Sequence, residues 1–365
     1  MNRTALRPPV RRLLAVGVAA TLTIGTLAGC SSGGGSSSAS GSSDDIGVSL
    51  IVKTTSNPFF VAMEDGAKAA AKKLGVNLTL AAGKEDGDED TQIQAVENAI
   101  SKGDKGILIT PNGPGVEDAL TKARDAGLYV IALDTPPSDP DAVDITFATD
   151  NYLAGQDIGK WTAAKLAGKK ATIAMIDLFD DKVVSVDVNR DQGFLNGMGI
   201  DLGDKAKNGD EKKTGSYSGG DYEIVGNEAS QGAEDGGRTA AETLLSQDPD
   251  INVVYTINEP AAYGAYQAFK AADKTDGLIV VSIDGGCAGV DNVKKGVIGA
   301  TSQQYPVKMA DLGVQAIFDL VKDGKKPEVS KGLDFYNTGV ALVTDDPQDG
   351  VESIDTAKAG DICWG

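Results

Sequence analysis

Short apolar runs alternate with amphipathic stretches along most of this chain, and this alternation limits the fold more than any other feature of the sequence. From Ile46 onward, each apolar run precedes a longer stretch of helical periodicity, and the first two such stretches end at Gly75 and Gly103. A strand, a crossover helix and the next parallel strand take about thirty residues, which is the spacing seen here. The alternation therefore predicts an α/β fold built on parallel sheets.

The expected strands are 47–52, 76–81, 106–110, 128–133, 144–148, 171–176, 253–257 and 278–283, and the expected helices are 58–74, 91–102, 116–126, 152–166, 188–198, 233–245 and 261–272. Residues 201–220 are polar and rich in glycine and lysine, which is typical of an exposed loop or hairpin. A chain of 365 residues is too long for one ordinary core, so two lobes are expected. The boundary near 148–151 has no Gly, Ser or Pro spacer, which favours lobes joined by strands.

The first residues have the order of a secretory signal. Arg3, Arg7, Arg11 and Arg12 precede an apolar run over 13–27 that is too short to be a good membrane span. The run ends in Leu27-Ala28-Gly29-Cys30, which resembles the bacterial lipobox and implies a lipid on the sulfur of Cys30. The alternative is a chance cysteine after a plain signal peptide.

The segment after Cys30 favours the lipid anchor over that alternative. Residues 31–43 are nearly all Ser and Gly, a composition that behaves as a flexible coil. The sequence therefore predicts a signal peptide over 1–29, a lipidated cysteine with its tether over 30–45, and a soluble body anchored to the outer face of the cell membrane.

The charge and the amino-acid usage exclude several functions. The formal net charge is −19, and loss of the four arginines of the signal makes the mature chain more negative still. Such a field repels nucleic acid, so no nucleic-acid partner is expected. The chain contains no His, which removes imidazole bases, His metal ligands and Ser-His-Asp catalysis. We expect neither a metal nor another cofactor.

Two cysteines are left once Cys30 carries a lipid. In an exported protein, Cys287 and Cys363 form a disulfide by default, and this bridge would hold the C-terminal end of the chain. The alternative is a pair of buried free thiols.

Polar and aromatic residues gather where strands end or helices begin, and sugar binding needs this mixture. A sugar has hydroxyls at its rim and C–H groups on its faces, so it is bound by carboxylates, amides, guanidinium groups and aromatic planes. Asp134, Asn258 and Asp284 follow or end expected strands, at the sheet edge where α/β proteins bind ligands. Phe59 and Phe60 begin a helix.

Plainer interpretations stay open for several of these residues. The two phenylalanines could be core residues, Asp134 could be a turn residue, and Arg190, flanked by acidic residues, could belong to a surface ion pair. The acidic stretch 84–90 lacks the spacing of a calcium loop and is expected to be a solvated surface. The glycine-rich stretch 285–289 is not followed by the Lys-Ser/Thr of a phosphate loop.

Several short fragments occur in a fixed order along 46–322: Ser56-Asn57-Pro58-Phe59-Phe60, Leu133-Asp134, Ala148-Thr149-Asp150-Asn151, Arg190-Asp191-Gln192-Gly193-Phe194, Ile257-Asn258-Glu259, Ile283-Asp284-Gly285-Gly286 and Ala300-Thr301-Ser302-Gln303-Gln304. Together they resemble the ribose-binding branch of the type I periplasmic binding proteins, the solute receptors of ABC importers. The resemblance implies the following ligand-binding residues: Asn57, Phe59, Phe60, Asp134, Arg190, Asn258, Asp284 and Gln304.

The sequence departs from the ribose binders at two places. Thr135 stands where they have an arginine, and 229–232 contains no aromatic residue where they have one. Lys53 replaces a small polar residue near the pocket mouth and would partly restore a cation, so it joins the expected ligand-binding residues. The whole pattern looks more like the fructose-type receptors of this branch.

The resemblance also implies the architecture and the role. Two doubly wound parallel-sheet lobes would be joined by a three-strand hinge, with crossings near 150, 305 and 337. The first lobe would comprise 46–149 and 305–336, and the second 150–304 and 337–365. A monomeric, non-enzymatic lipoprotein would deliver a monosaccharide, fructose-like or else ribose or another pentose or hexose, to an ABC permease. A sensor that presents its sugar to a receptor, or less readily a sugar-acting enzyme, is the alternative.

Overall fold

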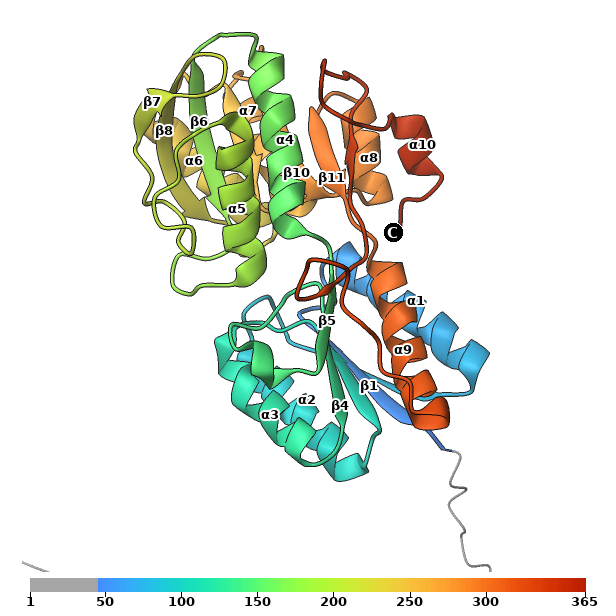
Figure 1. Ribbon diagram of the computed structural model, residues 1–365. Helices are drawn as coiled ribbons and strands as arrows, with labels where there is room; N and C mark the ends of the chain where they lie inside the picture. Colours follow the sequence, from blue (N-terminus) through green and yellow to red (C-terminus); the bar gives the residue numbers. More distant parts are fainter. Residues whose placement is uncertain (1–44) are drawn as a thin grey trace, which may run out of the picture. The chain divides into compact units, whose positions relative to one another are not determined.

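The computed structural model describes residues 45–365 (Figure 1). The signal, Cys30 and most of the tether lie outside the described residues, so their predicted roles stay predictions. Within 45–365, no helix is both long and apolar enough to cross a membrane.

The first lobe is built on a six-stranded sheet in which every neighbouring pair of strands is parallel. Its strands are β1 (Gly47–Val52), β2 (Asn77–Ala82), β3 (Gly106–Ile109), β4 (Tyr129–Leu133), β5 (Ile145–Ala148) and β12 (Tyr336–Asn337). They lie in the order β12-β5-β4-β3-β1-β2. The helical segments of this lobe are α1 (Pro58–Leu74), α2 (Glu89–Lys102), η1 (Pro114–Val116), α3 (Glu117–Asp125), η2 (Pro140–Ala142) and α9 (Pro306–Asp323).

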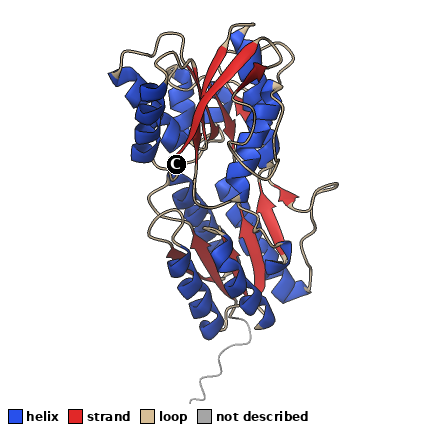
Figure 2. Cartoon of the chain, turned by 90° about the vertical axis from the view of Figure 1, so that its left-hand side faces the viewer, coloured by secondary structure: helices blue, strands red, loops and turns tan. Residues whose placement is uncertain are grey.

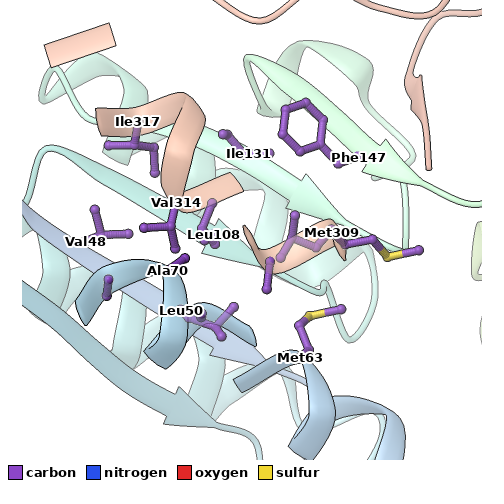
Figure 3. Close-up of a cluster of buried hydrophobic side chains, with 14 of the residues drawn as sticks. Val48, Leu50, Met63, Ala70, Leu108, Ile131, Phe147, Met309, Val314 and Ile317 are labelled. Carbon is purple, nitrogen blue, oxygen red and sulfur yellow. The ribbon is translucent and has the colours of Figure 1, made fainter. Parts of the chain in front are cut away.

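Helices cover both faces of this sheet because its strands are apolar on both faces. Val48 and Leu50 of β1 pack under α1 and α9, where Met63 and Val314 meet them (Figure 3). Ile51, between Leu50 and Val52, points to the opposite face and joins the cluster under α2 and α3. Successive side chains of a strand alternate between faces, and a continuous apolar run is therefore the pattern of a strand buried on both sides.

The second lobe is built on a seven-stranded sheet that is parallel except at its two edges. Its strands are β6 (Ala171–Asp177), β7 (Thr214–Ser216), β8 (Asp221–Ala229), β9 (Val253–Thr256), β10 (Ile279–Asp284), β11 (Ala300–Gln303) and β13 (Ala341–Val343). They lie in the order β13-β11-β10-β9-β6-β8-β7, with β7 and β13 antiparallel to their neighbours. Its helices are α4 (Asn151–Leu166), α5 (Ser185–Met198), α6 (Glu234–Gln247), α7 (Glu259–Ala271), α8 (Cys287–Lys294) and α10 (Thr356–Gly360).

The chain passes between the two sheets at three places. It leaves the first sheet after β5 to enter α4, returns after β11 to enter α9, and crosses again between β12 and β13. Strands of both sheets lie between layers of helices when the molecule is turned (Figure 2). The predicted fold class, two doubly wound lobes with a three-strand hinge, is confirmed.

The structure differs from the sequence-based elements mainly in the second lobe. Strand β8 was not predicted, because much of it is only half-buried and it lacks the apolar run that marks the other strands. Most of 201–220 has neither helix nor strand, and only β7 pairs with β8 as a short hairpin. In the first lobe, the expected helix 116–126 is α3 (Glu117–Asp125), preceded by the 3-10 turn η1 (Pro114–Val116).

Candidate functional site

A cavity of about 30 Å³ lies between the lobes, at the C-terminal ends of strands from both sheets. We call it the cleft. All nine residues that the sequence predicts for ligand binding line it. The lining residues are Lys53, Asn57, Phe59, Phe60, Asp86, Asp134, Leu178, Val186, Arg190, Ile257, Asn258, Asp284 and Gln304.

Two phenylalanines at the start of α1 form the aromatic wall of the cleft. Asn57 caps the helix, with its Oδ1 accepting a hydrogen bond of 2.9 Å from the backbone N–H of Phe59. The rings of Phe59 and Phe60 meet edge to face at 5.3 Å between centroids. Both side chains also belong to the buried core under α1. The core interpretation and the cleft interpretation therefore both hold for this pair.

Asp134 follows β4 and is held in the cleft by an unusual backbone conformation and by its neighbour. Its φ of 63° lies in the left-handed region, which non-glycine residues adopt rarely. The hydroxyl of Thr135 donates a hydrogen bond of 2.7 Å to Asp134 Oδ2. Oδ1 has no hydrogen-bond partner among residues 45–365. The Thr135 hydroxyl thus orients the carboxylate of Asp134.

Arg190 is a buried residue of the cleft, so its interpretation as a surface ion pair is wrong. Only 5% of it is exposed. Its Nε donates a hydrogen bond of 2.8 Å to Asn151 Oδ1, and Nη1 donates one of 3.0 Å to the carbonyl of Ile257. Nη2 lies 3.7 Å from Asp134 Oδ1. These contacts fix the plane of the guanidinium group across the cleft from the first lobe.

Asp284 ends β10, and its carboxyl group accepts hydrogen bonds from two neighbours. Its Oδ1 accepts a hydrogen bond of 3.1 Å from Gln304 Nε2, and its Oδ2 accepts one of 3.3 Å from the backbone N–H of Glu259. Burial, and then the nearby Glu259, hold the pKa of Asp284 well above its usual range. Gln304 Oε1 has no hydrogen-bond partner in the described part of the chain.

Glu259 lies behind Asp284 and was not among the predicted site residues. Its carboxyl group accepts hydrogen bonds from the backbone N–H groups of Gly285 (2.9 Å) and Gly286 (3.1 Å) and from the Thr301 hydroxyl (2.7 Å). Burial raises the pKa of Glu259 to about 7 against these donors, which favour the charged form. Glu259 therefore fixes the loop that follows β10 and supports Asp284 from behind.

Asn258 lines the cleft, but its amide group already makes two hydrogen bonds within the second lobe. Its Oδ1 caps α7 by accepting from the N–H of Ala261 at 3.1 Å, and its Nδ2 donates to the carbonyl of Gly232 at 2.9 Å. One N–H of the amide is left for a ligand.

Lys53 and Asp86 supply opposite charges at one side of the cleft. Lys53 is buried and lines the cleft. Burial raises the pKa of Asp86, and the charge of Lys53 opposes that rise. Asp86 is half-buried and lines the cleft, so it differs from the solvated surface expected for 84–90. Within 45–365, no group of acidic or cysteine side chains is arranged to hold a metal ion.

Of the four cleft residues that were not predicted, three come after strands, and the fourth, Val186, lies in α5. Asp86 and Leu178 come after the ends of β2 and β6, and Ile257 comes directly after β9. Applying the strand-end rule to every strand would have identified these three.

Polar contacts between the lobes surround the cleft. Beside the pair of Arg190 and Asp134, Lys182 Nζ donates to the carbonyl of Gly87 at 3.3 Å, and Ser185 Oγ donates to the carbonyl of Pro136 at 2.6 Å. The remaining cavity has room for only about two water molecules. A ligand of about ten heavy atoms or more can enter only when the lobes separate, as hinge closure requires.

Buried carboxyl groups support the second-lobe wall from behind. Asp187 Oδ1 accepts from the backbone N–H of Leu178 at 2.9 Å, and so fixes the chain where it reaches the cleft. Burial raises the pKa of Asp187 to about 6. Burial, together with charge repulsion from neighbouring acids, holds the pKa values of Asp177 and Asp191 well above their usual range. We call Asp177, Asp187 and Asp191 the acidic cluster.

Asp191→Asn should make the protein more stable at about pH 8. A carboxyl group whose pKa is raised by folding binds its proton more tightly in the folded state, so stability is lost as pH rises above the unfolded value of 3.8. The amide keeps the shape, cannot ionise and can donate to Asp177, whose Oδ1 has no hydrogen bond among the described residues. Urea unfolding from pH 4 to 8 should give a shallower decline for the variant. A variant that is less stable than the wild type at pH 8 would contradict this assignment.

The structure joins Cys287, the first residue of α8, to Cys363 in the C-terminal tail by a disulfide, with 5.0 Å between the Cα atoms. The partner of Cys287 thus lies 76 residues further along the chain.

Comparison with known proteins places the chain in a family. The model of the periplasmic binding protein domain matches residues 46–326. The ribose import binding protein of Salmonella typhimurium is 28% identical over 289 residues, which cover 79% of this chain and 88% of that protein. The D-allose-binding periplasmic protein of Escherichia coli is 26% identical over 303 residues, covering 81% and 91%.

A solved structure agrees with this placement. The ABC transporter solute-binding protein of Agrobacterium vitis with bound D-fucose is 25% identical, with a TM-score of 0.71, and the match covers 87% of this chain and 100% of that one. The family model covers well over half of the 365 residues, and both lobes have solved counterparts. The chain therefore belongs to the periplasmic binding protein domain family.

Proposed function

We propose that this protein captures a neutral monosaccharide outside the cytoplasm and delivers it to an ABC importer. One observation carries the proposal: buried polar atoms without hydrogen-bond partners among the described residues face two aromatic rings in a closed cleft. These atoms are Asp134 Oδ1 and Gln304 Oε1. Buried polar groups are normally hydrogen-bonded, so a cleft of this kind is complementary to a molecule with many hydroxyls.

The charges of the cleft favour a neutral sugar over a sugar acid or a sugar phosphate. The cations Lys53 and Arg190 face the carboxylates of Asp86 and Asp134. The raised pKa of Asp284 favours its neutral acid form, which can donate a hydrogen bond to a hydroxyl. An added phosphate or carboxylate would lie against the carboxylates of Asp86 and Asp134 in a buried cleft, where these acids already oppose the charges of Lys53 and Arg190.

The residue roles follow from this geometry. Phe59 and Phe60 would contact the C–H faces of the ring, and Asp134, Arg190 and Asp284 would bind its hydroxyls. Asn57, Asn258, Gln304 and Lys53 would supply the remaining contacts. The first lobe, 46–149 with 305–336, would close on the second, 150–304 with 337–365, about crossings near 150, 305 and 337.

The identity of the sugar is a finer question than its class. The two relatives above are named for ribose and D-allose, whereas Thr135 and the ring-free 229–232 make the cleft different from a ribose pocket. Because the sequence resembles the fructose-type receptors, fructose is also a candidate ligand. The protein would interact with the permease of an importer, and a lipid on Cys30 would attach it to the membrane. The family consists of binding proteins without catalytic activity.

A thermal-shift screen of monosaccharides tests the proposal. A ligand at about one hundred times its Kd adds about 2.7 kcal/mol to the free energy of unfolding, which raises the melting temperature by several degrees. We expect one or a few of ribose, D-allose and fructose to produce such a shift, and glucuronate and ribose 5-phosphate to produce none. A shift with the charged sugars alone, or with none of a broad neutral panel, would contradict the proposal.

A further inference from the structure

The C-terminal tail that follows α10 brings one tryptophan against both lobes. Cys363 is joined to Cys287 in the second lobe, and the backbone carbonyl of Trp364 accepts a hydrogen bond of 2.9 Å from the N–H of Cys287. The next contact of Trp364 is in the first lobe, where its side chain, 9% exposed, joins the core under α1 and α9. The tail is therefore attached covalently to one lobe and packed against the other.

The indole ring contacts the aromatic wall of the cleft from behind. Its centroid lies 5.3 Å from that of Phe59 at an interplanar angle of 82°, and Phe59 meets Phe60 at 5.3 Å in the same edge-to-face manner. Edge-to-face pairs at this distance attract because the positive ring edge meets the negative ring face. Trp364 does not line the cleft, but it holds a ring that does.

The same side chain contacts the backbone of two other cleft segments. Trp364 Nε1 donates a hydrogen bond of 2.8 Å to the carbonyl of Gln304, at the return crossing. A Cβ at Gly286 would lie 3.2 Å from the indole, which is closer than an ordinary van der Waals contact. Glycine at this position therefore lets the loop after Asp284 pack closely against the ring. Trp364 is thus in contact with the segments that carry Phe59, Gln304 and Asp284.

We infer that Trp364 is a positioning residue for ligand binding, and that the Cys287–Cys363 disulfide holds it in place. Carried by the second lobe, the indole docks on Phe59 of the first lobe and stabilises the closed arrangement. Removing the ring should therefore speed ligand release, while removing the disulfide should loosen the tail and weaken binding to a smaller extent. This inference rests on the proposed sugar-binding function and adds a residue that contacts no ligand.

Calorimetry and stopped-flow kinetics on the wild type and four variants test the inference, with the sugar that gives the largest thermal shift. Trp364→Ala should raise the Kd about 10- to 70-fold, from the lost aromatic pair and indole hydrogen bond, mainly through faster dissociation. Trp364→Phe, which keeps an aromatic ring against Phe59, should recover most of the affinity. Cys363→Ser should give a loss smaller than that of Trp364→Ala, as should reduction of the wild type with dithiothreitol.

The matched control is Trp161→Phe, because the chain has two tryptophans and Trp161 is also buried, in the second-lobe core. This variant should lose stability but keep the wild-type Kd, and its single tryptophan, Trp364, should change its emission on sugar binding. If Trp364→Ala lowers the melting temperature and leaves the Kd unchanged, Trp364 is only structural and the inference is wrong. If the wild type binds no sugar at all, the proposed function fails first, and the inference with it.

Discussion

Arg190→Ala should abolish detectable sugar binding. The side chain is buried, and its fork of donors is held rigidly by Asn151 and by the carbonyl of Ile257, with Nη2 directed at Asp134. Its removal deprives sugar hydroxyls of charged donors and leaves Asp134 without its nearest cation. Hydrogen bonds to charged groups contribute about 1.5–3 kcal/mol each, so two lost bonds weaken binding by about a hundredfold to more than ten-thousandfold.

Two further variants separate a binding role from a folding role. Arg190→Lys keeps the charge but not the planar fork and should bind weakly, because a single ammonium group cannot make the same set of bonds. Arg238→Ala removes an exposed arginine of α6 that pairs with Glu242, and it should bind like the wild type. Normal titration heats for Arg190→Ala would show that the residue is misassigned. A large fall in the melting temperature of its ligand-free form would show that it serves mainly the fold.

Cys30→Ala should move the protein from the membrane to the medium or the periplasm. The expectation comes from the lipobox-like Leu27-Ala28-Gly29-Cys30 and from the absence, within residues 45–365, of any helix that could span a bilayer. Two or more acyl chains anchor a protein stably, and no other attachment is expected once they are lost. Cell fractionation with immunoblotting should find nearly all of the wild type, but little of the variant, in membranes.

The control for this experiment is Ser31→Ala, which changes the neighbouring residue and should stay in the membrane. Cys30→Ala could keep its signal peptide uncleaved and stay in the membrane for that reason. A second variant therefore combines Cys30→Ala with a signal peptide that is cleaved without a lipobox. Equal membrane retention of this second variant and the wild type would show that the anchor lies elsewhere.

The cleft could be predicted from the sequence because it is built mainly from strand ends. Asp134 follows β4 and Asp284 ends β10, so a correct reading of the strands places both at one edge of their sheets. Glu259 and Asp86 escaped the analysis for different reasons. Glu259 acts through backbone N–H groups of a distant loop, and Asp86 stands in a stretch whose many charges indicate exposure.

The contacts of the tail could not be predicted at the level of side chains. The cysteine count pairs Cys287 with Cys363, but it does not indicate where the neighbouring Trp364 would lie. Its position depends on the return crossing at Gln304 and on the start of α1, segments that are far apart in the sequence. Strand β8 was missed for a different reason, because its half-buried residues do not form an apolar run.

A crystal structure of the protein with the sugar found in the thermal-shift screen would show directly whether the cleft is the binding site. We expect one sugar in the cleft, with a face of its ring against Phe59 or Phe60 and its hydroxyls within hydrogen-bond distance of Asp134, Arg190 and Asp284. The lobes should close around it, and the unpaired Oδ1 of Asp134 should gain a partner. A sugar bound on the surface, for example in the groove beside Tyr129 and Lys326, with the cleft unchanged, would contradict the account.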